Sequence, residues 1–85
     1  MAEITLEEIE TALKNEISII TGKKTEELKA EQSLSWNGIN SMGFVELLLS
    51  VNRLWSVNLL DAGIGTADVS TLSALAKRIR KELVR

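Results

Sequence analysis

Ser41 is the residue of this chain whose type and position best suit covalent chemistry. The turn signal Asn37-Gly38 and the capping residue Asn40 precede it, so Ser41 falls at the predicted start of a helix. Free N–H groups and the helix dipole favour a negative charge at such a position. No general base neighbours Ser41 in the sequence, which suits a hydroxyl that another enzyme activates. The plainer interpretation is that Ser41 only caps the helix.

The rest of the inventory offers little catalysis. The chain contains neither Cys nor His, which excludes disulfides, thiolate or imidazole metal ligands, and Cys or His nucleophiles. No acidic cluster has the spacing of a Mg²⁺ or Ca²⁺ site, so we expect no metal centre. The composition predicts a non-catalytic protein.

The elements that would position Ser41 are helices of one small all-α domain over residues 1–85. Thr5-Leu6-Glu7-Glu8 has the form of a capping box, and Gly22 suits a helix end, which predicts a helix over about 5–21. Apolar periodicity predicts further helices over about 41–55 and 70–84, with Ser70 or Thr71 as the last cap. A weak turn is expected within 56–69. The expected architecture is a three- to four-helix bundle with a long first loop.

The expected helix over 41–55 has a wide apolar arc and should be the most buried one. Its polar face is thin, and it comprises Gly43, Glu46, Ser50 and Arg53. The apolar anchors of the preceding loop are Leu28, Leu34, Trp36 and Ile39.

Charge and hydropathy limit the partners and the location. The net charge of -2 argues against a nucleic-acid binder. The acidic N-terminus lacks the apolar stretch of a signal peptide, and the longest aliphatic run, Leu47-Leu48-Leu49, is too short to span a bilayer, so we expect no membrane insertion. We therefore expect a cytoplasmic monomer. The basic residues near the C-terminus are expected to form a solvated helix face that complements the dipole.

The segment from Ser33 to Leu48, SLSWNGINSMGFVELL, resembles the modification site of an acyl or peptidyl carrier protein. Gly38-Ile39, Ser41 and Val45-Glu46-Leu47 match a Leu-Gly-Ile-Asp-Ser-Leu stretch followed by Val-Glu-Leu, and Met42 is a conservative replacement. The likeness extends over nearly the whole chain, including Val69-Ser70-Thr71-Leu72 at the start of the last helix. It also implies the acyl-carrier type of helix bundle.

This resemblance implies that Ser41 carries a 4′-phosphopantetheine arm, installed from coenzyme A by a Mg²⁺-dependent phosphopantetheinyl transferase. The arm would hold an acyl or aminoacyl group as a thioester for loading and acyl-transfer enzymes. Since the chain has no cysteine, such a thiol must come from a cofactor.

Three departures from the family pattern affect recognition and packing. Asn40 replaces the usual Asp, which keeps a good cap but removes a carboxylate. Asn37 stands where the family usually has a buried Leu, and we expect Trp36 to fill that space. The acidic row of fatty-acid carriers is reduced to Glu46, which favours a carrier for a specialised lipid, polyketide or peptide pathway.

Further residues are assigned to partner recognition and to cargo. The partner-recognition residues are Asn40, Met42, Glu46 and Arg53, with Met42 partly exposed. A segment weakened by Gly63 and Gly65 is expected to gate a cleft that shelters the acyl chain. The candidate lining is Val45, Leu48, Leu59, Ile64 and Val69.

Two other classes of function stay open. An unmodified carrier-like domain could act as a protein–protein adaptor, and the substitution of Asn40 for Asp favours that alternative. A helix-turn-helix DNA-binding domain fits the helix count, but Arg53 is the only basic residue of its middle helix.

Overall fold

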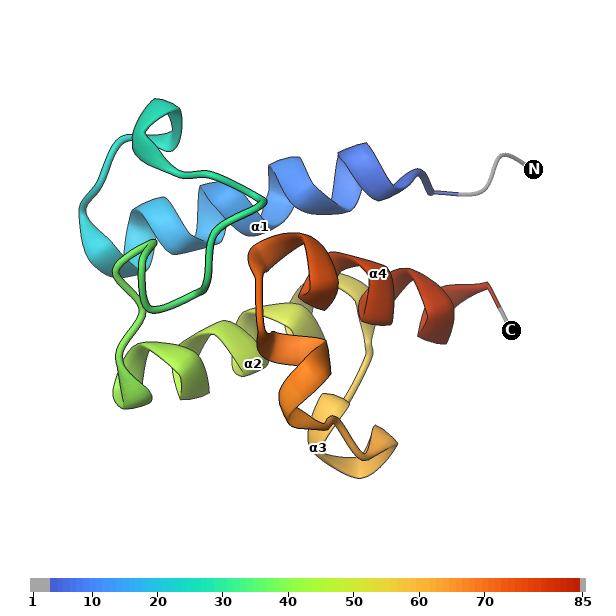
Figure 1. Ribbon diagram of the computed structural model, residues 1–85. Coiled ribbons are helices and arrows are strands. Elements are labelled where there is room, and N and C mark those ends of the chain that lie inside the picture. The colour runs from blue at the N-terminus through green and yellow to red at the C-terminus, as the bar shows by residue number, and fades with distance from the viewer. Residues whose placement is uncertain (1–3, 85) are drawn as a thin grey trace.

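The computed structural model describes residues 4–84, and every regular element in that range is helical. Three longer helices form the bundle: α1 (Leu6–Thr21), α2 (Ser41–Trp55) and α4 (Leu72–Leu83). A short helix, α3 (Leu59–Ala62), and two 3-10 segments, η1 (Thr25–Glu27) and η2 (Thr66–Val69), lie in the connections. Helix α1 packs against both α2 and α4, and the long loop joins α1 to α2 at one end of the bundle (Figure 1).

Local sequence signals set the helix ends. Thr5 Oγ1 accepts a hydrogen bond from the Glu8 N–H at 3.1 Å, whereas the Glu8 carboxylate accepts from the Thr5 hydroxyl. Gly22 ends α1 in a left-handed conformation, with a φ of 78°. Thr71, and not Ser70, caps α4 by accepting from the Ala74 N–H.

The core is built from one face of each long helix and from residues of the connections. Its fully or nearly fully buried members are Ile9, Leu13, Ile17, Leu28, Leu34, Ile39, Leu47, Val51, Val57, Leu59, Leu72, Leu75, Ala76 and Ile79. The loop anchors Leu28, Leu34 and Ile39 are confirmed as buried. Burial of apolar side chains is the main force that holds so small a bundle together.

The orientation of α2 differs from the expectation. Gly43 and Ser50, assigned to its polar face, are buried, whereas Val45 and Leu49 are exposed. A Cβ atom at Gly43 would lie 3.3 Å from Cγ2 of Ile20, so the missing side chain allows α2 to approach α1 closely. Gly43 thus lies at the contact with α1, and part of the apolar arc of α2 faces outward.

The connection over residues 56–69 is more regular than expected, because it contains both α3 and η2. Asn58 caps α3 through a hydrogen bond from the Asp61 N–H to the Asn58 Oδ1, and Gly63 ends α3 with a φ of 76°.

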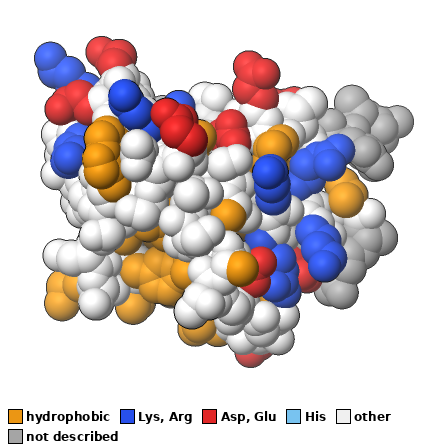
Figure 2. Space-filling view, viewed as in Figure 1, with side chains coloured by type: hydrophobic (Ala, Val, Ile, Leu, Met, Phe, Trp, Pro, Cys, Tyr) orange, Lys and Arg blue, Asp and Glu red, His pale blue; other side chains and the backbone are white. Residues whose placement is uncertain are grey.

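The surface seen in Figure 2 differs in character between two helices. Apolar side chains gather over α2, and Lys and Arg side chains gather over α4. Within residues 4–84, no helix combines the length and the hydropathy needed to cross a bilayer.

Candidate functional site

Ser41 is the first residue of α2, and its side chain is exposed. The residue that caps the helix is Asn40, whose Oδ1 accepts from the Gly43 N–H at 2.7 Å. The Asn40 carbonyl also accepts from the Phe44 N–H at 2.8 Å. The interpretation of Ser41 as the helix cap is therefore wrong. Among residues 4–84 no partner is found for the Ser41 hydroxyl, which leaves it available to another molecule.

The backbone before Ser41 is fixed by a tight turn. Gly38 has a φ of 95°, a conformation that side chains rarely adopt, and a Cβ there would lie 3.1 Å from Cε of Lys23. The Ile39 N–H donates to the Leu34 carbonyl at 2.9 Å, and the Ile39 side chain is buried. This turn brings the chain from the core to the surface within two residues of Ser41.

Asn37 holds the loop that carries this turn. Its side chain is completely buried and its Oδ1 accepts from the Lys29 N–H at 2.8 Å. Its Nδ2 donates to the carbonyls of Lys29 and Ser33, both at 2.9 Å, with a longer contact to Gln32. A buried amide that satisfies backbone groups eight residues away replaces the packing that an apolar residue would supply.

The expectation that Trp36 fills this space is wrong. Trp36 is 47% exposed and lies outside the core, with the Lys29 ammonium 5.9 Å from its ring centroid. Asn37 is small enough to enter the loop interior and polar enough to bond the backbone there. The Trp ring therefore remains at the surface.

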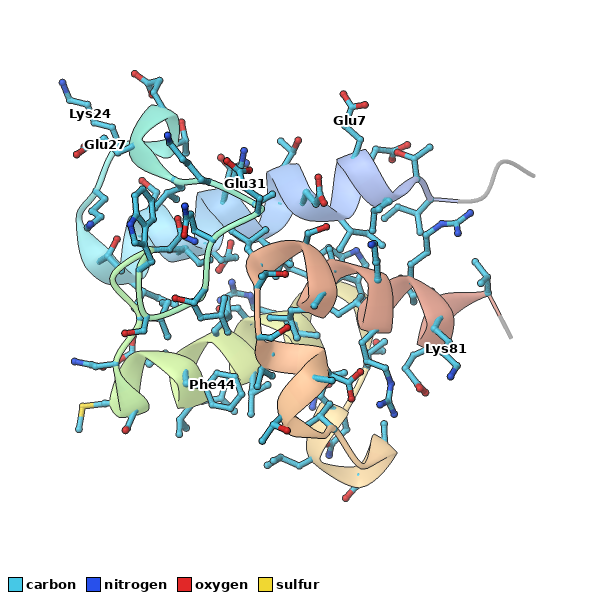
Figure 3. The ribbon with its side chains drawn as sticks, viewed as in Figure 1. Glu7, Lys24, Glu27, Glu31, Phe44 and Lys81 are labelled. Atoms are coloured by element: carbon cyan, nitrogen blue, oxygen red, sulfur yellow. The ribbon has the colours of Figure 1, made fainter. Side chains whose placement is uncertain are left out.

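A groove opens directly beside Ser41, with a volume of about 470 Å³. We call it the Ser41 groove; it lies between the loop, the first turn of α2 and η2. The lining residues are Leu34, Ser35, Ile39, Asn40, Ser41, Phe44 and Val69. The ring of Phe44 extends from α2 toward η2 (Figure 3). None of the lining side chains is ionisable, so the groove suits a neutral and largely apolar ligand.

Of the five residues expected to line an acyl cleft, only Val69 borders this groove. Leu59 is buried in the core, and Leu48 and Ile64 are half-buried against it. Val45 is exposed on α2. Phe44, Leu34 and Ile39 take the expected places, because α2 is rotated so that Phe44 rather than Val45 faces η2.

The residues expected to meet partner proteins are all accessible to solvent. Met42 is 73% exposed, and Asn40 and Glu46 are exposed as well. Arg53 is also exposed, but its Nη2 lies 2.8 Å from Oε1 of Glu16 and so connects α2 to α1. These four residues extend from the cap of α2, directly before Ser41, to the last turn of the helix.

Arg78 contradicts the expectation that the C-terminal basic residues are solvated. Its side chain is only 14% exposed and lies 2.9 Å from Asp68 and 3.1 Å from Glu82. Its Nη2 also donates to the Ala62 carbonyl at 2.6 Å. Arg78 thus connects α4 to the end of α3 and to η2. Only the Arg78–Glu82 spacing of four residues is visible in the sequence.

Asp68 links this cluster to the groove, because it precedes Val69. The Gly65 N–H donates to the Asp68 carboxylate, and this bond, together with the charge of Arg78, lowers the pKa of Asp68. The segment expected to be a flexible gate is therefore held by ionic hydrogen bonds at neutral pH.

Comparison of the chain with protein-family models, curated proteins and solved structures finds no match. Within residues 4–84, no three acidic side chains are grouped so that they could bind a metal ion.

Proposed function

We propose that the protein is a carrier whose Ser41 is modified with a 4′-phosphopantetheine arm. The observation that carries the proposal is the state of Ser41: its hydroxyl is exposed at the first position of α2, while Asn40 supplies the cap. Because Asn40 caps the helix, the Ser41 hydroxyl is not used for capping and is accessible to a modifying enzyme. The resemblance of residues 33–48 to carrier modification sites supports that modification.

The surroundings of Ser41 suit a phosphodiester. The amides of Ser41 and Met42 lie at the open N-terminal end of α2, where the helix dipole stabilises an anion. No acidic residue lines the Ser41 groove, so an attached phosphate meets no like charge there. The apolar lining offers a surface for the arm or for its cargo. When attached, the arm supplies the thiol that this chain lacks.

The chain's part in the transfer step is that of an acceptor. Ser41 Oγ forms a P–O bond to the phosphorus that carries the pantetheine part of coenzyme A. The pyrophosphate bond breaks, and adenosine 3′,5′-bisphosphate leaves. The hydroxyl proton passes to a base of the transferase, since no base among residues 4–84 bonds Ser41.

Intact-mass measurement after incubation with coenzyme A, Mg²⁺ and a broad-specificity transferase tests the proposal. The expected result is one added phosphopantetheinyl group on the wild-type chain and none on Ser41→Ala. Ser35→Ala is the matched control, because Ser35 is exposed and borders the same groove. That control should be modified as the wild type is. No addition with several transferases would overturn the proposal.

Asn40→Asp separates a carrier from an unmodified adaptor. Asp is an equally good cap, so the bond to the Gly43 N–H and the fold should persist. For a working carrier the substitution should raise the modification rate no more than about tenfold. A chain that is modified only after Asn40→Asp would instead favour the adaptor.

A further inference from the structure

The pair Asn37-Gly38 has the sequence that is most prone to spontaneous deamidation, and Asn37 is the only asparagine of the chain that precedes a glycine. In this reaction the Gly38 nitrogen attacks Cγ of Asn37 and closes a succinimide ring, the bond from Cγ to Nδ2 breaks, and ammonia leaves. Water then opens the ring at either carbonyl, which gives aspartate or isoaspartate at position 37. Glycine favours the attack because it has no Cβ atom to hinder the approach.

The fold requires both members of this pair. Gly38 has a φ of 95°, and a Cβ atom there would lie 3.1 Å from Cε of Lys23, so another residue would strain the turn. The Asn37 side chain is completely buried and accepts a hydrogen bond from the Lys29 N–H. Its Nδ2 donates to the carbonyls of Lys29 and Ser33. A reactive sequence is therefore built into the loop that leads to α2.

The closed loop blocks each step of the reaction. The Gly38 N–H, whose nitrogen must attack, donates to the Ser35 carbonyl at 2.9 Å. The nitrogen that must leave, Nδ2 of Asn37, is held by two carbonyls at 2.9 Å. Burial of Asn37 also keeps water away from Cγ, although water must open the ring. Deamidation at position 37 therefore requires the loop to open.

The contacts that hold the loop are few and separable from the helix core. Between α1 and α2, η1 is the only regular element that the described residues form. The loop is held by buried anchors such as Leu28 and Leu34, and by hydrogen bonds from the Leu72 and Ser73 N–H groups to its carbonyls. Segments of this kind open at a lower free energy than the helices of a core. Opening of the loop alone should therefore set the rate of deamidation.

We propose that Asn37-Gly38 is a covalent switch, which deamidates when the loop opens locally and then prevents the loop from closing. A carboxylate at position 37 still accepts from the Lys29 N–H, but it supplies no N–H to the carbonyls of Lys29 and Ser33. It also places a negative charge against these two carbonyl oxygens in a buried position. Isoaspartate adds one more backbone atom to the turn at Gly38. The switch is independent of the modification of Ser41.

Peptide mapping by mass spectrometry of the full chain, kept at neutral pH, measures the rate of deamidation at position 37 and distinguishes it from that at Asn40. The reference is the same chain unfolded in guanidinium chloride. Leu28→Ala removes a loop anchor that is 3% exposed. The matched control is Leu59→Ala, because Leu59 is 2% exposed and belongs to α3, which lies away from the loop (Figure 1). Denaturant unfolding of both variants gives their free energies of unfolding, so that local opening is separated from global opening.

Position 37 of the native wild-type chain is expected to deamidate at least about a hundredfold more slowly than in the unfolded chain. At equal free energy of unfolding, Leu28→Ala should accelerate the reaction about tenfold more than Leu59→Ala. Equal rates in the native and unfolded chains would overturn the inference. An acceleration that follows the global free energy of unfolding alone would also overturn it, because the loop would then not open separately.

The effect on the loop is tested on the product of the reaction. Ion-exchange chromatography separates the deamidated chain, which carries one more negative charge. Amide hydrogen exchange over residues 29–39 should be about tenfold or more faster in this product than in the untreated chain, with little change in the middle of α1. Unchanged exchange over the loop would mean that it closes around the new carboxylate, which would contradict the switch.

Discussion

At the scale of single residues, two asparagines define the site. Asn40 takes the capping role and so leaves Ser41 free, while Asn37 bonds the backbone of the loop from inside. Both are amides, but one is exposed and the other is completely buried. Their sequence positions, three residues apart around Gly38 and Ile39, give no sign of this difference.

Among the polar residues of the loop, we expect Asn37 to lower the free energy of unfolding most when it is substituted. Asn37→Ala leaves the Lys29 N–H without its partner and removes one of the two donors to each of the carbonyls of Lys29 and Ser33. The expected cost is about 3 kcal/mol of the free energy of unfolding, measured by urea denaturation. Asn37→Leu should cost nearly as much, because it restores volume but no hydrogen bond.

Trp36→Ala is the control for this prediction. The Trp36 ring is half-exposed and contacts Lys29 only through a cation–π interaction, so its loss should cost about 1 kcal/mol or less. A larger cost for Trp36→Ala than for Asn37→Ala would contradict the account of the loop.

At the scale of elements, the connection over 56–69 depends on α4. Arg78 reaches from α4 to Asp68 in η2 and to the carbonyl that ends α3. The Val69 side chain in turn borders the Ser41 groove. Arg78 therefore positions the η2 wall of the Ser41 groove, although Arg78 itself does not line the groove.

Removing the guanidinium should loosen this connection without unfolding the bundle. Arg78→Met keeps an apolar stem against α4 but removes the donor to the Ala62 carbonyl and leaves the Asp68 carboxylate with the Gly65 N–H alone. Amide hydrogen exchange over 59–69 should accelerate about tenfold or more, while exchange in α1 changes little. Lys77→Met, at the exposed neighbouring position, is the control and should leave the segment unchanged. Equal effects of the two substitutions would contradict the role of Arg78.

The same segment should respond to acid through Asp68. The folded pKa of Asp68 lies below its ordinary value, chiefly because the Gly65 N–H donates to the carboxylate, so the ionised form stabilises the fold. This stabilisation is present above the ordinary Asp range, near pH 4, and is lost as the pH falls through the lowered pKa.

An NMR titration of the Gly65 amide checks this prediction. The shift of the Gly65 N–H should follow a midpoint below about 3.9, the ordinary value for Asp. In Asp68→Asn the titration should be absent. A midpoint at or above the ordinary value would mean that the bond to Gly65 does not form in solution.

At the scale of the whole molecule, the long loop connects the starts of two helices. The Leu72 N–H donates to the Gln32 carbonyl at 3.1 Å and the Ser73 N–H to the Ala30 carbonyl at 2.8 Å. The loop thereby satisfies amides at the start of α4 while it leads into the start of α2. Ser41 is held from the α1 side by the turn at Gly38 and from the α4 side by these bonds.

This arrangement explains how far the sequence could predict the fold and the site. Thr5, Gly22 and Asn40 act on neighbours within a few residues, so their types alone indicate the helix ends. The contacts of Asn37 and Arg78 join residues farther apart, and no local pattern reports them. The prediction of which side chains of α2 are buried was wrong, because α2 has more apolar side chains around its axis than the core can bury.

Localising the modification within the chain tests the central claim most directly. After incubation with coenzyme A, Mg²⁺ and a transferase, fragmentation mass spectrometry assigns the added group to one residue. The account predicts phosphopantetheine on Ser41 alone, although Ser33, Ser35 and Ser50 lie in the surrounding sequence. Attachment at another serine, or an unmodified chain with every transferase tried, would contradict it.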